Sequence, residues 1–120
     1  MKQTGESFEI NTSVTYVATR VRQHDAEDNI RIGQLEGRNA LVLEQELAGR
    51  VFQTWIYHYN GILWELFISE DGTVAAGLGQ ELVPVYNFTI DMPREDLIYV
   101  SAESQSGIYS RKLIGIRSGG

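Results

Sequence analysis

The chain has 120 residues, a length typical of one domain with a single hydrophobic core. Its 10 basic and 16 acidic residues give a formal net charge of −6. This charge argues against nonspecific binding to nucleic acid, which depends on Lys and Arg contacts to phosphates, and against attachment to an anionic membrane surface. The sequence has no cysteine, so disulfides, thiolate metal sites and cysteine nucleophiles are excluded together.

An amphipathic helix is predicted over residues 4–23. Ile10, Val14, Val17 and Val21 recur at spacings of four, three and four, which places them in one narrow seam. Acidic residues near the start and arginines near the end complement the helix dipole. Because the interior is rich in Val and Thr, which are weak helix formers, we expect this helix to depend on packing against other elements.

Residues 50–69 hold both tryptophans and predict the central hairpin. At its middle, Asn60-Gly61 suits the two positive-φ positions of a type I′ turn. The register set by this turn gives four cross-strand pairs on one side, which are Tyr59 with Ile62, Tyr57 with Trp64, Trp55 with Leu66 and Gln53 with Ile68. We therefore expect the other elements to assemble around this hairpin.

The predicted hairpin has two faces, and the aromatic cross-strand pairs favour one of them as core. We expect that face to fill the space beneath the helix. The residues predicted for this helix–sheet core are Ile10, Val14, Val17, Val21, Trp55, Tyr57, Trp64 and Leu66. The opposite face is predicted to be either capped by other strands or an exposed apolar interaction surface. It consists of Phe52, Ile56, His58, Leu63 and Phe67.

Further short strands are predicted on both sides of the hairpin. They lie at residues 30–33, 40–47, 81–83, 86–92, 97–102 and 108–117. The apolar positions of the most regular segment are Tyr86, Phe88, Ile90 and Met92. One helix followed by about seven short, mostly antiparallel strands predicts a single α+β domain over residues 1–120, with the helix on one face of the sheet.

Neither histidine is predicted to carry chemistry. His24 is placed in a polar loop beside Asp25, Glu27 and Asp28, and this spacing fits neither a calcium-binding loop nor a zinc pattern. A solvated loop is the more typical interpretation, so no metal is predicted. His58 is interpreted as an exposed or half-packed strand residue.

Other candidate sites are equally incomplete. Asp91, Glu95 and Asp96 flank a proline turn, where acidic residues are common for structural reasons. The run at residues 77–79, Gly-Leu-Gly, lacks the third glycine and the following helix of a dinucleotide loop. We therefore predict no enzymatic activity and no cofactor. Because Trp and Tyr rings also bind sugar faces, binding of a glycan, small molecule or protein by residues 50–69 stays open as an alternative to a purely structural role.

Four segments carry a resemblance to a known family: TSVTYVATRVRQHD, IRIGQLEGRNALVLEQEL, FQTWIYHYNGILWELF and LIGIRS. Over about residues 7–118 the chain resembles an uncharacterised domain family of Firmicutes, chiefly clostridial. Members of that family look like short proteins with one N-terminal hydrophobic segment and an outer domain. This layout is similar to that of the minor pseudopilins of competence and type IV pilus systems.

The resemblance implies a non-enzymatic structural or assembly subunit with a pilin-like fold. It implies an extracytoplasmic domain whose partners are other pilin-like subunits. Residues 1–120 would then be the soluble portion, and membrane contact would come only from an N-terminal segment absent from this sequence. Direct binding to nucleic acid is not expected.

Overall fold

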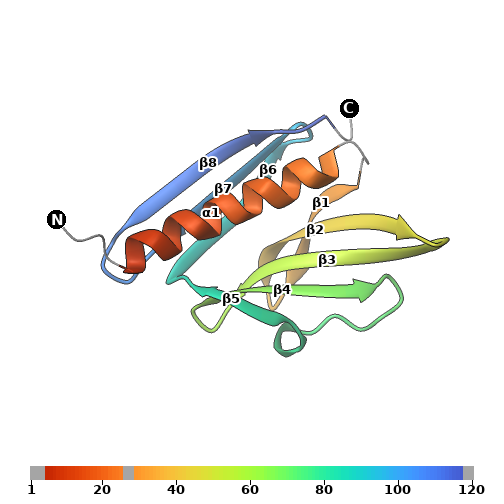
Figure 1. Ribbon diagram of the computed structural model, residues 1–120, viewed down its shortest axis with the longest axis horizontal. Helices are drawn as coiled ribbons and strands as arrows, with labels where there is room; N and C mark the ends of the chain where they lie inside the picture. The colour runs from red at the N-terminus through yellow and green to blue at the C-terminus, as the bar shows by residue number, and fades with distance from the viewer. Residues whose placement is uncertain (1–4, 26–28, 118–120) are drawn as a thin grey trace.

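The computed structural model describes residues 5–25 and 29–117, which form one long helix and two antiparallel sheets (Figure 1). The helix α1 spans Gly5–His24. The first sheet consists of β1 (Ile30–Leu35), β2 (Arg38–Leu47), β3 (Arg50–Tyr59), β4 (Ile62–Ser69) and β5 (Gln80–Pro84), in that order. The second consists of β6 (Asn87–Arg94), β7 (Leu97–Glu103) and β8 (Tyr109–Gly115). A short 3₁₀ helix, η2 (Ala76–Leu78), lies between β4 and β5.

This architecture confirms the predicted α+β class with an N-terminal helix and antiparallel strands. It differs from the prediction in the sheets, because the eight strands of the described residues form two sheets of five and three. After β5 the chain turns away, and β6 pairs with β7 instead of extending the first sheet. The predicted helix start at residue 4 and the predicted loop residues Glu27 and Asp28 lie outside the described residues.

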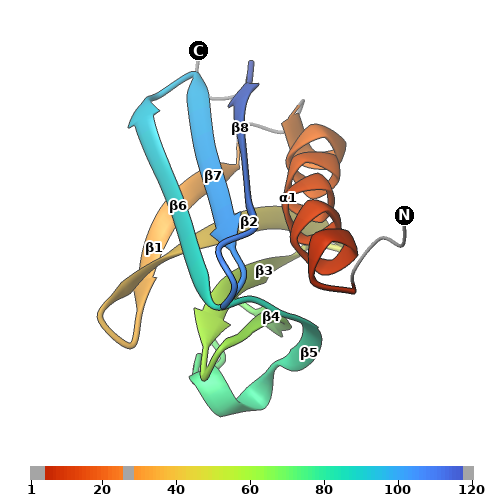
Figure 2. The same cartoon turned by 90° about the vertical axis from the view of Figure 1, so that its left-hand side faces the viewer.

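The helix α1 lies along β7 and β8 and also packs against β2 of the five-stranded sheet (Figures 1 and 2). The predicted seam of Ile10, Val14, Val17 and Val21 is at most 2 % exposed and belongs to the main core. The strand and loop residues of that core are Leu41, Leu43, Ile56, Leu63, Val85, Ile90, Ile98, Val100, Ala102, Ile114 and Ile116. One helix face is therefore shared by the two sheets, which also contact each other directly through β2 and β6.

The central hairpin has the predicted turn and register. Asn60 and Gly61 have φ angles of 53° and 73°, as a type I′ turn requires. The predicted pairs are all present, with Tyr59 opposite Ile62, Tyr57 opposite Trp64, Trp55 opposite Leu66 and Gln53 opposite Ile68. The local turn thus sets the strand alignment of β3 and β4.

The hairpin face beneath the helix is the opposite of the one predicted. Ile56 and Leu63 are fully buried under α1, in the core that was assigned to the other face. The residues wrongly assigned to the helix–sheet core are Trp55, Tyr57, Trp64 and Leu66, which form a second cluster with Ala40 and Ala76. Ile56 and Leu63 are aliphatic, like the helix residues in the same cluster, so this contact leaves no polar side-chain atom to satisfy.

The second cluster also satisfies the polar atoms of its aromatic rings. The hydroxyl of Tyr57 donates to the carbonyl of Ala76 at 2.6 Å, and Nε1 of Trp64 donates to the carbonyl of Tyr59 at 2.8 Å. Buried Tyr and Trp need such partners, and the helix seam of Ile and Val offers none. Gly79 makes room for the Tyr57 ring, since a Cβ atom there would lie 2.3 Å from the hydroxyl.

The apolar residues predicted for the buried side of β6 lie there, except for the first of them. Ile90 is buried, and Phe88 and Met92 are partly buried against the main core. Tyr86, predicted to share this face, lies before β6 and is 56 % exposed. Tyr86 lies in the connection from β5 of the first sheet to β6 of the second, so the alternation of β6 does not extend back to it.

The corrected face assignment predicts different costs for two substitutions on β4. Leu63→Ala removes a side chain that is fully buried and is expected to lower the free energy of unfolding by about 2–5 kcal/mol. Phe67→Ala removes a ring that is 54 % exposed and is expected to cost about 1 kcal/mol or less. Urea denaturation measures both values, and a larger cost for Phe67→Ala would contradict the assignment.

Candidate functional site

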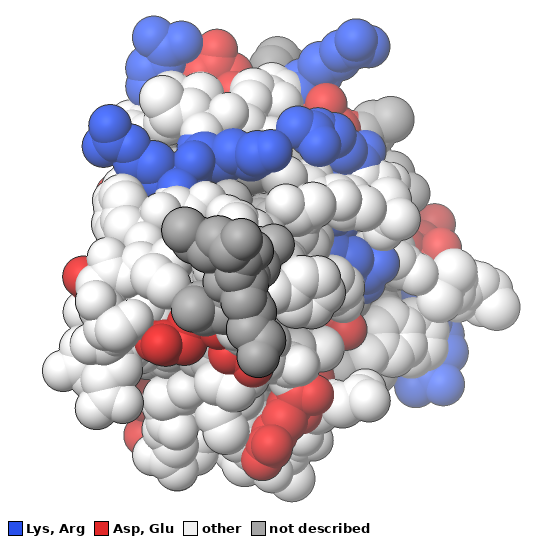
Figure 3. All heavy atoms as spheres, turned by 60° about the vertical axis from the view of Figure 1, so that its left-hand side comes forward, with Lys and Arg blue, Asp and Glu red and all other residues white. Residues whose placement is uncertain are grey.

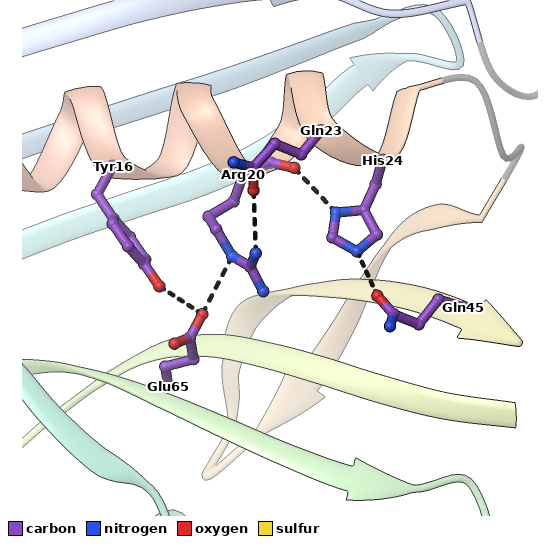
Figure 4. Close-up of polar contacts among 6 residues, drawn as sticks. All are labelled: Tyr16, Arg20, Gln23, His24, Gln45 and Glu65. Carbon is purple, nitrogen blue, oxygen red and sulfur yellow. Dashed lines mark hydrogen bonds and ion pairs between the residues drawn. The ribbon is translucent and has the colours of Figure 1, made fainter. Parts of the chain in front are cut away.

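Polar side chains connect α1 to β4 beside the buried seam (Figure 4). The hydroxyl of Tyr16 donates to Oε2 of Glu65 at 2.6 Å, and Nε of Arg20 lies 3.3 Å from the same oxygen. The Arg20 guanidinium also donates from Nη1 to Oε1 of Gln23 at 3.0 Å. Since Nε of Arg20 makes no aligned hydrogen bond, its contact with Glu65 is an ion pair only. We call Tyr16, Arg20 and Glu65 the helix clamp.

The helix clamp keeps the Tyr16 phenol neutral. Burial, followed by the hydrogen bond and the negative charge of Glu65, raises the pKa of Tyr16 to about 12, against an opposing effect of Arg20. A neutral phenol donating to a carboxylate is a structural arrangement and not a poised base. The chemistry of the clamp is therefore to fix the rotation of α1 on the five-stranded sheet.

His24 is the last residue of α1 and is buried, so its predicted place in a solvated loop is wrong. Its Nδ1 lies 3.0 Å from the carbonyl of Arg20 and its Nε2 lies 2.9 Å from Oε1 of Gln45 (Figure 4). A carbonyl only accepts, so Nδ1 carries a proton, and Nε2 bonds the side-chain amide of Gln45. Both ring nitrogens are thus used to hold the helix end on β2.

The described residues contain no group of three or more His, Cys, Asp or Glu side chains placed to hold a metal ion. Of the acidic residues beside His24 in the sequence, Asp25 is described, and its Oδ1 accepts from the backbone N–H of Arg117. This contact joins the end of the helix to the strand end after β8. Asp25 is therefore occupied in a structural bond.

His58 is buried between the two sheets and is not the exposed or half-packed residue that was predicted. Its Nε2 donates to the carbonyl of Val85 at 2.6 Å, and its Nδ1 accepts from Nη1 of Arg38 at 3.0 Å. The ring also lies 6.3 Å from that of Phe88 on β6. This pattern of one donor and one acceptor fits the neutral imidazole with its proton on Nε2.

A surface hollow of about 420 Å³ borders His58 and is lined by Glu36, Arg38, His58, Tyr59, Asn60, Gly61 and Tyr86. Burial and the nearby Arg38 charge lower the pKa of His58, with burial the larger cause, against the hydrogen bond to Val85. Because both ring nitrogens are engaged, the imidazole connects β3 to the segment entering β6. The hollow is lined by polar groups, but both ring nitrogens of its histidine are already used in hydrogen bonds within the fold.

The predicted interaction surface is divided by the fold. Ile56, His58 and Leu63 are buried, so three of its five members are unavailable to a partner. Phe52 and Phe67 remain partly exposed or exposed and stack with their ring centroids 5.3 Å apart. We call these two rings the Phe52–Phe67 pair. The guanidinium of Arg50 lies 5.5 Å from the Phe52 ring, a cation–π contact at the edge of the pair.

The predicted acidic candidates have separate local partners. Oδ1 of Asp91 accepts from the N–H of Met92 at 2.8 Å, and Asp96 pairs with Arg94 at 3.2 Å. Both contacts are exposed, as expected for residues that shape a hairpin end. Figure 3 shows basic side chains gathered in the upper part of one face and acidic side chains in its lower part. The face therefore has two regions of opposite charge.

The family comparison matches residues 8–105 to a family described as Domain of unknown function (DUF4860). The match covers more than half of the chain. The chain belongs to this family. The DUF4860 match includes most of α1 and all strands from β1 to β7. The helix clamp, the second cluster and the buried residues of the main core other than Ile114 and Ile116 therefore lie in the matched region.

No curated protein and no solved structure matches the chain. Among the described residues, no helix is long and apolar enough to cross a membrane. Evidence for the role of this DUF4860 domain thus comes from its own residues. Sequence reasoning missed the helix clamp, because Tyr16 and Glu65 are 49 residues apart and nothing in the local pattern joins them.

Replacing Tyr16 by Phe tests the helix clamp by alkaline titration. The pKa of Tyr16 is raised from 10 to about 12, so the native state favours the neutral phenol. The stability that this provides is fully present below pH 10 and is lost as the pH rises through about 12. In Tyr16→Phe the fall in Tm over that interval should be shallower, and an unchanged slope in this variant would contradict the assignment.

Acid titration tests the buried, neutral state of His58. Because the pKa of His58 is lowered from 6.5, the unfolded chain binds a proton that the native chain excludes. Stability is therefore present above pH 6.5 and is lost as the pH falls below that value. His58→Gln should flatten the Tm profile just below pH 6.5. Equal slopes in wild type and His58→Gln would contradict the assignment.

Proposed function

We propose that this DUF4860 chain is a non-enzymatic structural or assembly subunit, the outer domain of an envelope-anchored protein with a minor pseudopilin-like layout. The observation that carries this proposal is the placement of α1. The helix begins at one end of the molecule and lies along the sheets with its apolar seam enclosed (Figure 1). An N-terminal helix covered in this way by antiparallel strands is the arrangement that the resemblance implies.

The position of the helix start supports anchoring from that end. A helix continued upstream of Gly5 would leave the body of the domain, since its first turn lies beside the β7–β8 connection at the edge of the molecule (Figure 1). An apolar upstream segment of about 20 residues would then reach across a bilayer while both sheets stay outside it. The domain would be extracytoplasmic, with other pilin-like subunits as partners and no direct contact with nucleic acid.

The polar contacts also support a non-enzymatic role. Both histidines use their two ring nitrogens in hydrogen bonds that connect elements of the fold. Glu65 is occupied by Tyr16 and Arg20, and Asp96 by Arg94. These side chains hold the helix and hairpins in place, which is a structural use of groups that could otherwise carry acid–base chemistry.

A second candidate function is extracellular binding of a glycan, small molecule or protein at residues 50–69. The Phe52–Phe67 pair and Arg50 favour it, because exposed stacked rings beside a cation form a recognition surface. The tryptophans are less suited to it, because Nε1 of Trp55 already donates to Gln53 and Nε1 of Trp64 to Tyr59. Titration of the Phe52→Ala/Phe67→Ala double variant against a glycan panel separates this candidate from the first.

Deletion of the gene tests the first proposal. We expect loss of surface filaments, DNA uptake or secretion, with recovery on complementation by the full-length gene. Complementation by a version that begins at Gly5 should fail, because the domain would be made without its anchor. Normal behaviour of the deletion strain in all three assays would contradict the assembly role.

A further inference from the structure

The strand β8 pairs with β7 on one side and with no strand of the described residues on the other. The N–H of Ser104 donates to the carbonyl of Ile108 just before β8. The N–H of Ile116 donates to the carbonyl of Asp96 just after it. Since bonded and non-bonded pairs alternate in an antiparallel ladder, the even-numbered residues of β8 bond to β7. The residues whose N–H and C=O groups point away from β7 are therefore Tyr109, Arg111, Leu113 and Gly115.

These four residues are all exposed, and we call the row of their outward N–H and C=O groups the β8 edge. Figure 1 shows β8 along one margin of the molecule, with β7 on its inner side. A row of unpaired main-chain donors and acceptors is a template to which an extended segment can add as a further strand. The seven residues of β8 would pair with a segment roughly 20 Å long.

The other strands at sheet edges offer less to an added strand. On β6 the carbonyl of Ile90 already accepts from Nδ2 of Asn39 at 3.1 Å, and β6 packs against both β1 and β2. The strand β5 is shorter than β8, ends at Pro84 and pairs with β4 through a shifted register. The β8 edge, in contrast, has a regular register and no covering strand among the described residues.

The side chains of β8 are basic in a chain that is acidic overall. Arg111 and Lys112 stand at the middle of the strand, and residues 107–117 contain no Asp or Glu, although the net charge of the chain is −6. Two β8 edges placed side by side would bring these cations together, and like charges on neighbouring strands are destabilising. The charge of β8 therefore disfavours a second copy of the same edge and favours an acidic strand.

A carboxylate already bonds the same row of main-chain groups where the row meets α1. Arg117 lies two residues beyond Gly115, so its N–H continues the outward row, and it donates to Oδ1 of Asp25 after the end of α1. An acidic side chain of this chain thus satisfies the outward N–H next to the β8 edge. The contact also sets the limit of the open row, which runs from Tyr109 to Gly115.

We propose that the β8 edge binds an extended acidic segment of another polypeptide, which adds to the three-stranded sheet as a fourth strand. Its main chain would pair with the outward groups of β8. Because Arg111 and Lys112 point to opposite faces of the sheet, two successive carboxylates of the segment would complement them. Tyr109 and Leu113 are 52 % and 65 % exposed and would lie beside apolar residues of the segment. The occupant is thus a strand-forming segment with two acidic residues between apolar ones.

The size of the contact predicts weak binding. A single short segment must be ordered when it binds, so a dissociation constant of about 10–100 µM is expected for an isolated peptide. The inference goes beyond the proposed function and does not depend on it. Binding of a peptide to the isolated domain is measured without the anchor or the pilin-like partners, so its outcome and that of the gene deletion are separate.

Fluorescence anisotropy with labelled, end-blocked peptides tests the charge preference. The peptide Thr-Val-Val-Glu-Glu-Thr-Val should bind the wild-type chain, and the same peptide with Lys in place of both Glu residues should not. The net charge of −6 alone would favour the opposite order. The double variant Arg111→Glu/Lys112→Glu should exchange the two preferences. Equal binding of the two peptides, a preference of the wild type for the basic one, or no binding of the acidic one up to about 1 mM overturns the proposal.

Two substitutions of Leu113 separate main-chain pairing from charge. Leu113→Pro removes an outward N–H and no bond to β7, a place where edge strands accept proline. It should weaken binding of the acidic peptide by about tenfold or more, because a main-chain bond is lost and the ring blocks the edge. Leu113→Ala keeps the N–H and should weaken binding less. Circular dichroism shows that each variant is folded. Equal binding by the two variants would mean that charge alone holds the peptide and would overturn the proposal.

Amide hydrogen exchange followed by NMR gives a measurement on the wild-type chain, which needs no variant to fold. Without peptide, the four outward N–H groups of the β8 edge should exchange faster than the N–H groups of Ser110, Lys112 and Ile114, which bond to β7. The acidic peptide should slow the outward four and leave the other three unchanged. Outward N–H groups that exchange at the same rate with and without the peptide, or that a thymidine oligonucleotide slows equally, overturn the proposal.

Discussion

Burial of one narrow helix seam is the constraint on which the two sheets depend. Ile10, Val14, Val17 and Val21 lie almost fully out of water, and each contributes on the order of 1.5–3 kcal/mol relative to an exposed side chain. A helix with this much Val and Thr is weak on its own, so its stability comes from that contact. The sheets gain as well, because β7 and β2 both pack against this helix, in addition to the direct contact between β2 and β6.

The five-stranded sheet is covered on two sides, and this explains the distribution of its residues. In β2, four consecutive residues from Ala40 to Leu43 are fully buried, since Leu41 and Leu43 face the helix while Ala40 faces the aromatic cluster. A strand exposed on one face would alternate between buried and exposed residues. The aromatic cluster thus forms a second small core under η2, with hydrogen bonds that the aliphatic seam does not provide.

Short-range sequence patterns correctly predicted the local structure of the hairpin and of the helix. Asn60-Gly61 determined the register of β3 and β4, because a two-residue turn leaves one alignment. The helix seam followed from its period. The sequence did not indicate which hairpin face meets the helix, because both faces carry large apolar residues and the choice depends on distant partners. His58 is an example, since the contacts that bury it come from Arg38 and Val85, 20 and 27 residues away.

The helix clamp determines which positions of α1 face the sheets and which face outward. Tyr16 and Arg20 hold Glu65 from one flank of the helix and so fix its rotation on the sheet. With that rotation fixed, the outward positions of α1 touch neither sheet, and strong helix formers there would stabilise the helix at no cost to the core. Threonine at these positions gives up that stability. The stability of α1 therefore comes from its buried seam and from the helix clamp, and its outward positions contribute little to it.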